Sequence, residues 1–223
     1  MLAVPVKPVG ALVVDDDPFT LGMLATALTT LGMHPVRSAA SAAEAMWMAS
    51  HEEPEVAVLD LDLGEGPTGI DLAHGLRRLH PSIGLVIIST YAEPRLMGLN
   101  LPALPEDSIY LVKRSVTDTE VLGRALQLAV ERPGAGTASA LANREPLRDS
   151  MSDLNIEIMR LIAAGHSNAE IARLRVMSVS GVEKAVNRII RQLEIPGGKE
   201  SSQRVLIAQA YFKLTGAVSA RRG

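Results

Sequence analysis

Short apolar runs alternate with amphipathic stretches along the first 130 residues. The apolar runs have the length of buried β-strands and lie at residues 11–14, 56–59, 85–88 and 109–112, with a weaker one around residues 35–36. Apolar residues at helical spacing occupy residues 19–31, 42–50, 69–79 and 117–130. Strands that alternate with helices form a parallel sheet covered on both faces. We therefore predict an α/β fold with a doubly wound, five-stranded parallel sheet.

The pattern changes after residue 131. Residues 132–149 lose the apolar periodicity and contain three of the helix-breaking residues Pro and Gly within four positions, which is typical of a linker. Every element predicted beyond it is helical. We predict an α/β domain at residues 9–131, a linker at 132–149, and a second, smaller all-α domain at 150–216.

The composition narrows the class of protein. The chain of 223 residues is 47% hydrophobic and 21% charged, which is the composition of a protein with a packed core. It has no cysteine, which excludes disulfides and cysteine-based catalysis. Its longest apolar run is far shorter than the roughly 18 residues of a membrane-spanning helix. We predict a cytoplasmic protein that does not interact with a membrane.

The charge is divided unequally between the two predicted domains. Residues 1–130 contain 8 Lys and Arg against 16 Asp and Glu, whereas residues 150–223 contain 11 against 6. A cation-binding or phosphate-handling domain joined to a polyanion-binding domain would have this distribution, and so would two ordinary surfaces.

Acidic residues lie where the predicted strands end. Asp15 and Asp16 follow the first strand and Asp60 follows the third, while Ser89 and Lys113 end the fourth and fifth. These positions converge on one edge of a parallel sheet, where three carboxylates repel one another unless a cation such as Mg²⁺ lies among them. If Asp60 attacked a phosphoryl group, Mg²⁺ and Lys113 would neutralise its oxygens, and Ser89 would donate a hydrogen bond to one of them.

Four motifs in order resemble the signature of the receiver domain of two-component response regulators, which has a flavodoxin-like fold. They are LVVDDDP at residues 12–18, VLDLDL at 58–63, IIST at 87–90 and YLVK at 110–113. The resemblance implies that a sensor histidine kinase phosphorylates Asp60, that Ser89 and Lys113 hold the phosphoryl group, and that Tyr110 switches rotamer. It implies a set of Mg²⁺ ligands made of Asp15, Asp16, Asp60 and the backbone carbonyl of Asp62.

Two segments depart from the pattern of that family. Residues 63–67 replace the usual turn after the phosphorylated residue and predict a longer loop beside the site. Residues 99–108 replace the usual entry to the fifth strand, so we expect the preceding helix to be short or irregular. A second interpretation stays open: Asp60 and Asp62 also fit the aspartate pair of a haloacid dehalogenase-like phosphatase fused to a helical module.

The basic second domain has the pattern of a helix-turn-helix. A capping box, Ser167 with Glu170, starts a short helix, and a longer helix follows at about residues 180–193. This region resembles the LuxR-type helix-turn-helix of NarL/FixJ response regulators. The resemblance implies that the second helix enters the major groove of DNA and that its outer face binds DNA through Glu183, Lys184, Asn187, Arg188 and Arg191. Arg175 could contact phosphate or be a surface charge, and Arg204 could match a family arginine or form a hydrogen bond within the domain.

These observations together predict a response regulator that is not an enzyme. Phosphorylation of Asp60 with Mg²⁺ would shift an equilibrium toward a state that dimerises or binds DNA and so regulates transcription. We expect the active form to be a homodimer in which the last helix, at about residues 202–214, makes the contact.

Overall fold

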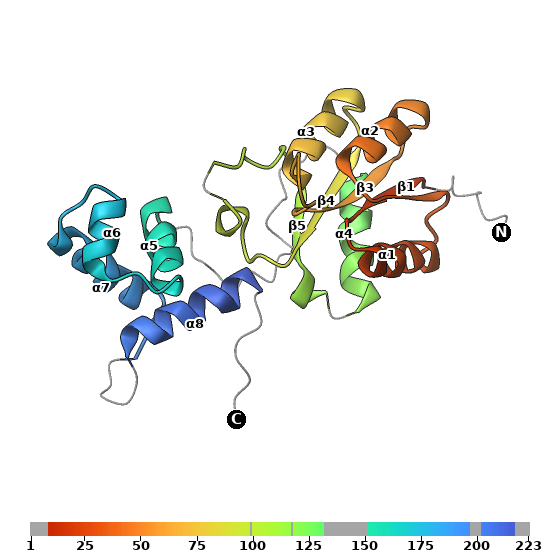
Figure 1. Cartoon of the computed structure of the whole chain (residues 1–223). Coiled ribbons are helices and arrows are strands. Elements are labelled where there is room, and N and C mark those ends of the chain that lie inside the picture. Colours follow the sequence, from red (N-terminus) through yellow and green to blue (C-terminus); the bar gives the residue numbers. More distant parts are fainter. Residues whose placement is uncertain (1–8, 99, 117, 132–150, 197–201, 217–223) are drawn as a thin grey trace. The chain divides into compact units, whose positions relative to one another are not determined.

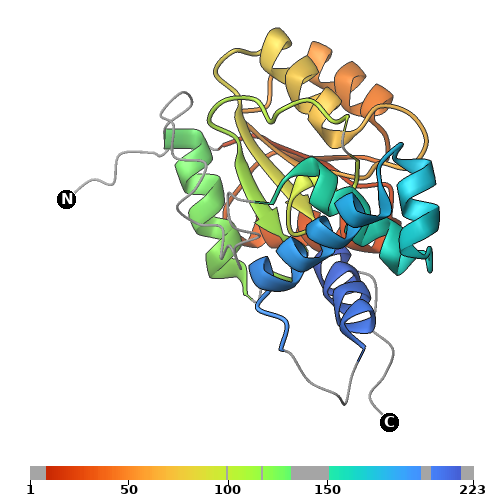
Figure 2. The same cartoon turned by 90° about the vertical axis from the view of Figure 1, so that its left-hand side faces the viewer.

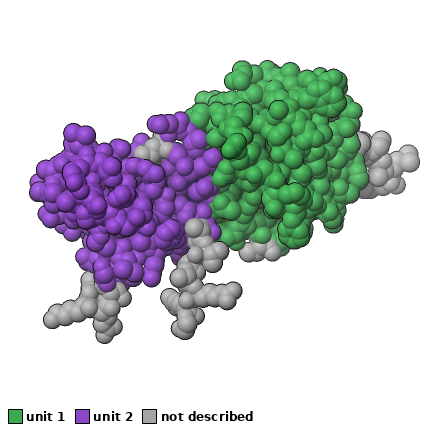
Figure 3. Space-filling model, in the orientation of Figure 1, with its two compact units in different colours: residues 1–90, 102–143 green, residues 91–101, 144–223 purple. Residues whose placement is uncertain are grey.

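The computed structural model describes residues 9–98, 100–116, 118–131, 151–196 and 202–216 (Figure 1). The chain divides into two compact units, one made of residues 1–90 and 102–143 and the other of residues 91–101 and 144–223 (Figure 3). The predicted linker lies outside the described residues, and the predicted domain boundaries stay predictions. The second unit includes a piece of chain, residues 91–101, that the sequence analysis assigned to the α/β domain.

The first unit contains the predicted five-stranded parallel sheet. Its strands are β1 (Ala11–Val14), β2 (Val36–Ala39), β3 (Val56–Asp60), β4 (Gly84–Ser89) and β5 (Ile109–Val112), in the order β2-β1-β3-β4-β5. Three central strands are fully buried runs of mainly Val, Ile and Leu, as expected for a sheet covered on both faces. The predicted α/β fold class is confirmed. The strand order reverses between β1 and β3, and ligand sites of such sheets lie at the carboxyl ends of the strands near this point.

Two pairs of helices cover the two faces of the sheet (Figures 1 and 2). Helices α1 (Pro18–Thr30) and α4 (Thr119–Glu131) lie on one face, and α2 (Ala42–His51) and α3 (Gly69–Leu79) lie on the other. Helix α4 begins two residues later than predicted, because the Asp118 carboxylate accepts hydrogen bonds from the backbone N–H groups of Glu120 and Val121 and so caps the helix.

The chain between β4 and β5 is mostly irregular. Its described residues contain one short 3₁₀ helix, η1 (Pro94–Leu96), which confirms the expectation of a short or irregular helix. Residues 102–108 are attached to α3 by two side chains: a ring nitrogen of His74 lies 2.8 Å from the carbonyl oxygen of Ala103, and Arg77 donates a hydrogen bond to that of Glu106.

The second unit is helical, as predicted. Its helices are α5 (Asp153–Ala163), α6 (Asn168–Leu174), α7 (Val179–Gln192) and α8 (Gln203–Thr215). Ser152, Ser167 and Ser178 cap the first three helices by accepting a hydrogen bond from the third helical residue, and Ser167 forms the predicted capping box with Glu170. Among the described residues, no helix combines the length and the apolar character needed to cross a membrane.

Candidate functional site

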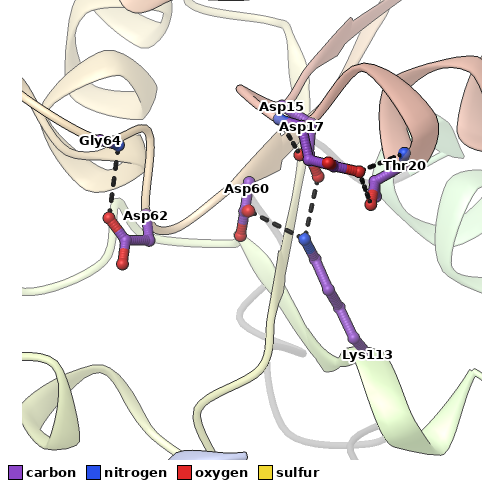
Figure 4. Close-up of polar contacts among 7 residues, drawn as sticks. All are labelled: Asp15, Asp17, Thr20, Asp60, Asp62, Gly64 and Lys113. Atoms are coloured by element: carbon purple, nitrogen blue, oxygen red, sulfur yellow. Dashed lines mark hydrogen bonds and ion pairs between the residues drawn. The ribbon is translucent and has the colours of Figure 1, made fainter.

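Carboxylates from two neighbouring strands converge at the carboxyl edge of the sheet (Figure 4). Asp15 follows β1 and Asp60 is the last residue of β3, and both are buried, with 0% and 7% of their surface exposed. Asp16 is exposed at the rim. One carboxylate oxygen from each of Asp15, Asp16 and Asp60 lies within 4.8 Å of the other two. The fold therefore brings together the acidic cluster that the sequence predicted.

The Lys113 side chain lies between the two buried carboxylates. Its Nζ donates hydrogen bonds to Asp15 Oδ2 at 2.9 Å and to Asp60 Oδ2 at 2.8 Å, across sequence separations of 98 and 53 residues (Figure 4). Lys113 follows β5, so three strands contribute to this contact. The ammonium of Lys113 partly neutralises the two buried carboxylates, whose burial as unpaired charges would destabilise the folded protein.

The surroundings shift the pKa values of both partners. Burial raises the pKa of Asp60; Lys113 opposes this shift, and the charge of Asp15 adds to it. Burial by itself lowers the pKa of Lys113, but hydrogen bonds to Asp60 and Asp15 and their charges outweigh it, so the pKa lies above its usual value. Lys113 is therefore a permanent cation at neutral pH, fixed where it can contact an anionic group on Asp60.

The carboxylate cluster has the chemistry of a site for a hard divalent cation. Three carboxylates supply oxygen ligands, which Mg²⁺ prefers, and the exposure of Asp16 leaves one side open to water and substrate oxygens. Asp15, Asp16 and Asp60 could hold such a cation.

The predicted longer loop lies next to this cluster. Gly64 has φ of +74°, a left-handed conformation that favours glycine, and a Cβ there would lie 3.2 Å from Asp16 Oδ2. The Asp62 side chain points away from Asp60 and Lys113 and accepts a long hydrogen bond from the Gly64 N–H (Figure 4). The carboxylate of Asp62 is thus outside the cluster. The family resemblance implies a metal ligand only in the backbone carbonyl of Asp62, not in this carboxylate.

Ser89 and Tyr110 lie on the fourth and fifth strands, as the sequence predicted. Ser89 is the last residue of β4, is 1% exposed, and follows Ile88, the residue that pairs with Asp60 across the β3–β4 ladder. Tyr110 lies within β5 and is buried, and it pairs with Ile87 of β4. Asp17 has a capping role instead: its carboxylate accepts hydrogen bonds from the N–H and hydroxyl of Thr20 at the start of α1.

Gly69 begins the predicted helix at residues 69–79, but reasoning from the sequence gave it no role in the site. It is the first residue of α3, and its N–H donates a hydrogen bond to the Leu61 carbonyl. A Cβ at this position would lie 1.9 Å from the Asp60 carbonyl oxygen, so only glycine lets α3 approach the β3 end this closely. The signal in the sequence is the capping box on either side of it, Thr68 with Asp71, which fixes where the helix starts.

The residues predicted to bind DNA share one exposed face of α7. They are Glu183, Lys184, Asn187, Arg188 and Arg191. The opposite face of the helix is buried through Val182, Ala185 and Ile189, which fixes the orientation of the exposed one. At the start of the helix, the Gly181 N–H donates a hydrogen bond to the Ser178 hydroxyl at 3.0 Å.

Two arginines for which the sequence left two alternative roles have partners inside the second unit. Arg204 donates hydrogen bonds to Asn168 Oδ1 at 2.6 Å and to the His166 carbonyl, so it links α8 to the start of α6. Arg175 lies 3.9 Å from Glu157, a nearly buried carboxylate whose pKa is lowered chiefly by its hydrogen bonds from Arg160. The intradomain alternative is thus the one observed for Arg204.

Comparisons with known proteins agree on one family. Residues 11–104 match the response regulator receiver domain. Response regulator protein VraR of Staphylococcus saprophyticus is 24% identical over 209 residues, which cover 90% of this chain and 96% of that protein. Oxygen regulatory protein NreC of Staphylococcus haemolyticus is 23% identical over 180 residues, 75% of this chain and 82% of the relative.

Solved structures show the same two-domain fold. One is a structure of the RcsB response regulator of Salmonella typhimurium, which concerns conformational dynamism for DNA interaction. The match covers 94% of this chain and 99% of the RcsB chain, with a TM-score of 0.53 and 18% sequence identity. A structure of two RcsB dimers bound to two parallel DNAs covers 93% of this chain and all of its own with a TM-score of 0.50 and 16% identity.

Proposed function

We propose that this response regulator, in which residues 11–104 match the receiver domain, is phosphorylated on Asp60 by a sensor histidine kinase and regulates transcription in the cytoplasm by binding DNA. Its relatives VraR and NreC are regulatory proteins, which supports this function over the phosphatase alternative and agrees with the prediction that the chain is not an enzyme. The observation that carries the proposal is the contact of Lys113 Nζ with Asp60 Oδ2 at 2.8 Å inside the acidic cluster.

The chemistry of the first step follows from this contact. An oxygen of the Asp60 carboxylate attacks the phosphorus of the kinase's phosphohistidine, a new O–P bond forms, and the P–N bond breaks with its electron pair left on the imidazole nitrogen. Asp15, Asp16, Asp60 and the Asp62 carbonyl would hold Mg²⁺, which neutralises charge on the phosphoryl oxygens.

The side chains around Asp60 would hold the product. Lys113 lies close enough to exchange its hydrogen bond from the Asp60 carboxylate to a phosphoryl oxygen, because the ammonium has three donors and a long flexible stem. The Ser89 hydroxyl would donate to a second oxygen, and Tyr110 in the neighbouring strand would change rotamer when Ser89 moves.

The second step is DNA binding through the exposed face of α7. Three of its five residues are cationic and one is an amide, groups that contact phosphates and base edges in the major groove. The RcsB structure contains dimers on DNA, and we propose a homodimer for the active form here, with α8 as the contact. Val205 and Phe212 of α8 are partly exposed apolar residues that such a contact would cover.

A titration of genomic fragments tests the function as a whole. In a gel-shift assay, the chain should bind a subset of fragments, and beryllofluoride with Mg²⁺, which mimics the phosphoryl group, should tighten that binding. The shift should weaken steeply as salt rises, because cations of the protein displace counterions from DNA. Equal binding to every fragment, or none at low salt, would argue against a sequence-specific regulator.

Substitutions within α7 should separate base reading from phosphate binding. Lys184→Ala or Asn187→Ala should cost about 1–3 kcal/mol at a specific operator and little on random DNA, because these side chains share the face expected to meet base edges. Arg191→Ala should weaken both complexes similarly and lower the salt slope by about one. Parallel titrations check this, and equal losses on both DNAs for all three variants would show that the helix has another orientation.

A further inference from the structure

The exposed face of α7 contains one carboxylate among its cations, that of Glu183. Side chains three and four positions apart are neighbours on a helix, and the four residues at these positions from Glu183 are Val179, Ser180, Val186 and Asn187. None of them is a cation. Among the residues that the structure describes, none forms an ion pair with Glu183. The charge of this carboxylate is therefore not balanced within the helical unit.

A carboxylate on this face weakens DNA binding unless a base offers it a donor. The phosphates of both strands repel it. In the major groove, the N4 amino group of cytosine is the donor that a Glu side chain accepts from. Adenine fits less well, because its amino group lies beside the N7 acceptor, which repels the second carboxylate oxygen. Opposite any other group, Glu183 would lose water without gaining a partner, so it would reject wrong bases as well as select cytosine.

An apolar side chain lies on the same ridge of the helix. Val179 is the first residue of α7 and precedes Glu183 by four positions, so their Cβ atoms are about 5–6 Å apart. Val179 is 44% exposed and does not belong to the buried face of α7. The apolar group that DNA presents in the major groove is the C5-methyl of thymine. Because bases on one strand are about 3.4 Å apart, two such side chains meet bases one or two positions apart.

The charges around this ridge fit a polyanionic partner. Lys184, Arg188 and Arg191 are exposed on the same helix, and residues 150–223 contain 11 Lys and Arg against 6 Asp and Glu. In a helix-turn-helix, the N-terminal part of the second helix contacts base edges. Val179 and Glu183 both lie in the N-terminal half of α7, so they would face bases while the cations nearby meet phosphates.

We propose that Glu183 and Val179 determine two bases of the operator. Glu183 accepts a hydrogen bond from the N4 amino group of a cytosine, and Val179 contacts the C5-methyl of a thymine one or two base pairs away. This inference rests on the proposed function, because it needs α7 to enter the major groove of DNA. It adds to that function part of the sequence that the chain recognises.

Selection from randomised duplex DNA tests the role of Glu183. The full-length chain, with beryllofluoride and Mg²⁺, should enrich sites that contain a cytosine with a thymine one or two positions from it. Glu183→Gln keeps the size of the side chain and removes its charge, so the preference for cytosine should fall by about tenfold. The same variant should bind random DNA more tightly, because repulsion by the phosphates is lost.

Glu194→Gln is the matched control for this selection. It removes the same charge from an exposed residue just beyond the end of α7, outside the ridge of Val179 and Glu183. Its selected sites should keep the cytosine. Identical base preferences in the natural chain and Glu183→Gln would overturn the role of Glu183.

Uracil in place of the selected thymine tests the role of Val179, because it removes the methyl group alone. The natural chain should bind the uracil site about fourfold more weakly, which is the contribution of one buried methyl group. Val179→Ala should bind the two sites equally. Val176→Ala, which shortens a 94% exposed valine in the turn before α7, should keep the fourfold difference. The same difference in Val179→Ala as in the natural chain would overturn the contact with thymine.

The selection separates this inference from the proposed function. A pool without any enriched sequence would contradict sequence-specific DNA binding, and the base assignments with it. An enriched site whose bases depend on neither Glu183 nor Val179 would contradict the assignments alone. Both side chains are exposed, so circular dichroism of each variant should match that of the natural chain.

Discussion

Asp60→Asn should abolish binding of beryllofluoride with Mg²⁺, as measured by fluorine NMR. The substitution keeps the size of the side chain but removes the anionic oxygen that would bond to beryllium or phosphorus, and it removes one of the three carboxylates of the acidic cluster. Asp15 also contacts Lys113, at 2.9 Å, but 0% of its surface is exposed against 7% for Asp60, so Asp60 is the more accessible of the two buried carboxylates. We expect a complete loss of the bound signal.

Asp62→Asn is the matched control for this experiment. It makes the same chemical change two residues further along, in a side chain that points toward Gly64 and away from Lys113, and it leaves the backbone carbonyl in place. This variant should bind beryllofluoride as the natural chain does. A bound signal in Asp60→Asn, with circular dichroism showing that it is folded, would contradict the assignment of the phosphorylation site.

Gly69→Ala should lower the free energy of unfolding by about 3 kcal/mol, the upper range for overpacking a tight site. A Cβ at this position would lie 1.9 Å from the Asp60 carbonyl oxygen and 2.9 Å from its carbon, so α3 or the end of β3 must move. Both are rigid backbone elements, which makes the adjustment costly. Denaturant titration of the full chain measures the effect.

Gly22→Ala should change the free energy of unfolding in the opposite direction within the same domain. Gly22 lies in the middle of α1, is exposed, and a Cβ there would meet no atom within 4 Å. Alanine should raise the free energy of unfolding by about 0.5–1 kcal/mol, because it restricts the unfolded chain and favours the helix. If both variants had the same small effect, the close approach of α3 to Asp60 would be wrong.

Much of the α/β fold could be predicted because its signals are local. The runs at β1, β3, β4 and β5 are short, apolar and separated by helical patterns, and a sheet buried on both faces requires this alternation. The weak strand was predicted only around residues 35–36, whereas β2 spans Val36–Ala39, because it is an edge strand with half of its residues partly exposed.

The acidic cluster could be predicted for a topological reason. Once the strands are parallel, residues that follow them lie at one edge of the sheet, and the strand order then puts Asp15 and Asp60 on neighbouring strands, within reach of the long Lys113 side chain. The exposed face of α7 was predictable in the same way, since helical spacing separates it from the buried face.

By itself, therefore, the sequence determined the parallel sheet, the helical second part, and the residues that gather at the sheet edge and on α7. Only the tertiary structure decided that α3 packs on the Asp60 backbone at Gly69, that Arg204 bonds within its own unit, and that residues 91–98 pack with helices about 60 and 120 residues away. The period of apolar residues follows from the geometry of each helix or strand, so it can be read from a short stretch of sequence. The contact of Arg95 with Asp153 joins an irregular segment to the start of a distant helix, and no spacing rule links these two residues.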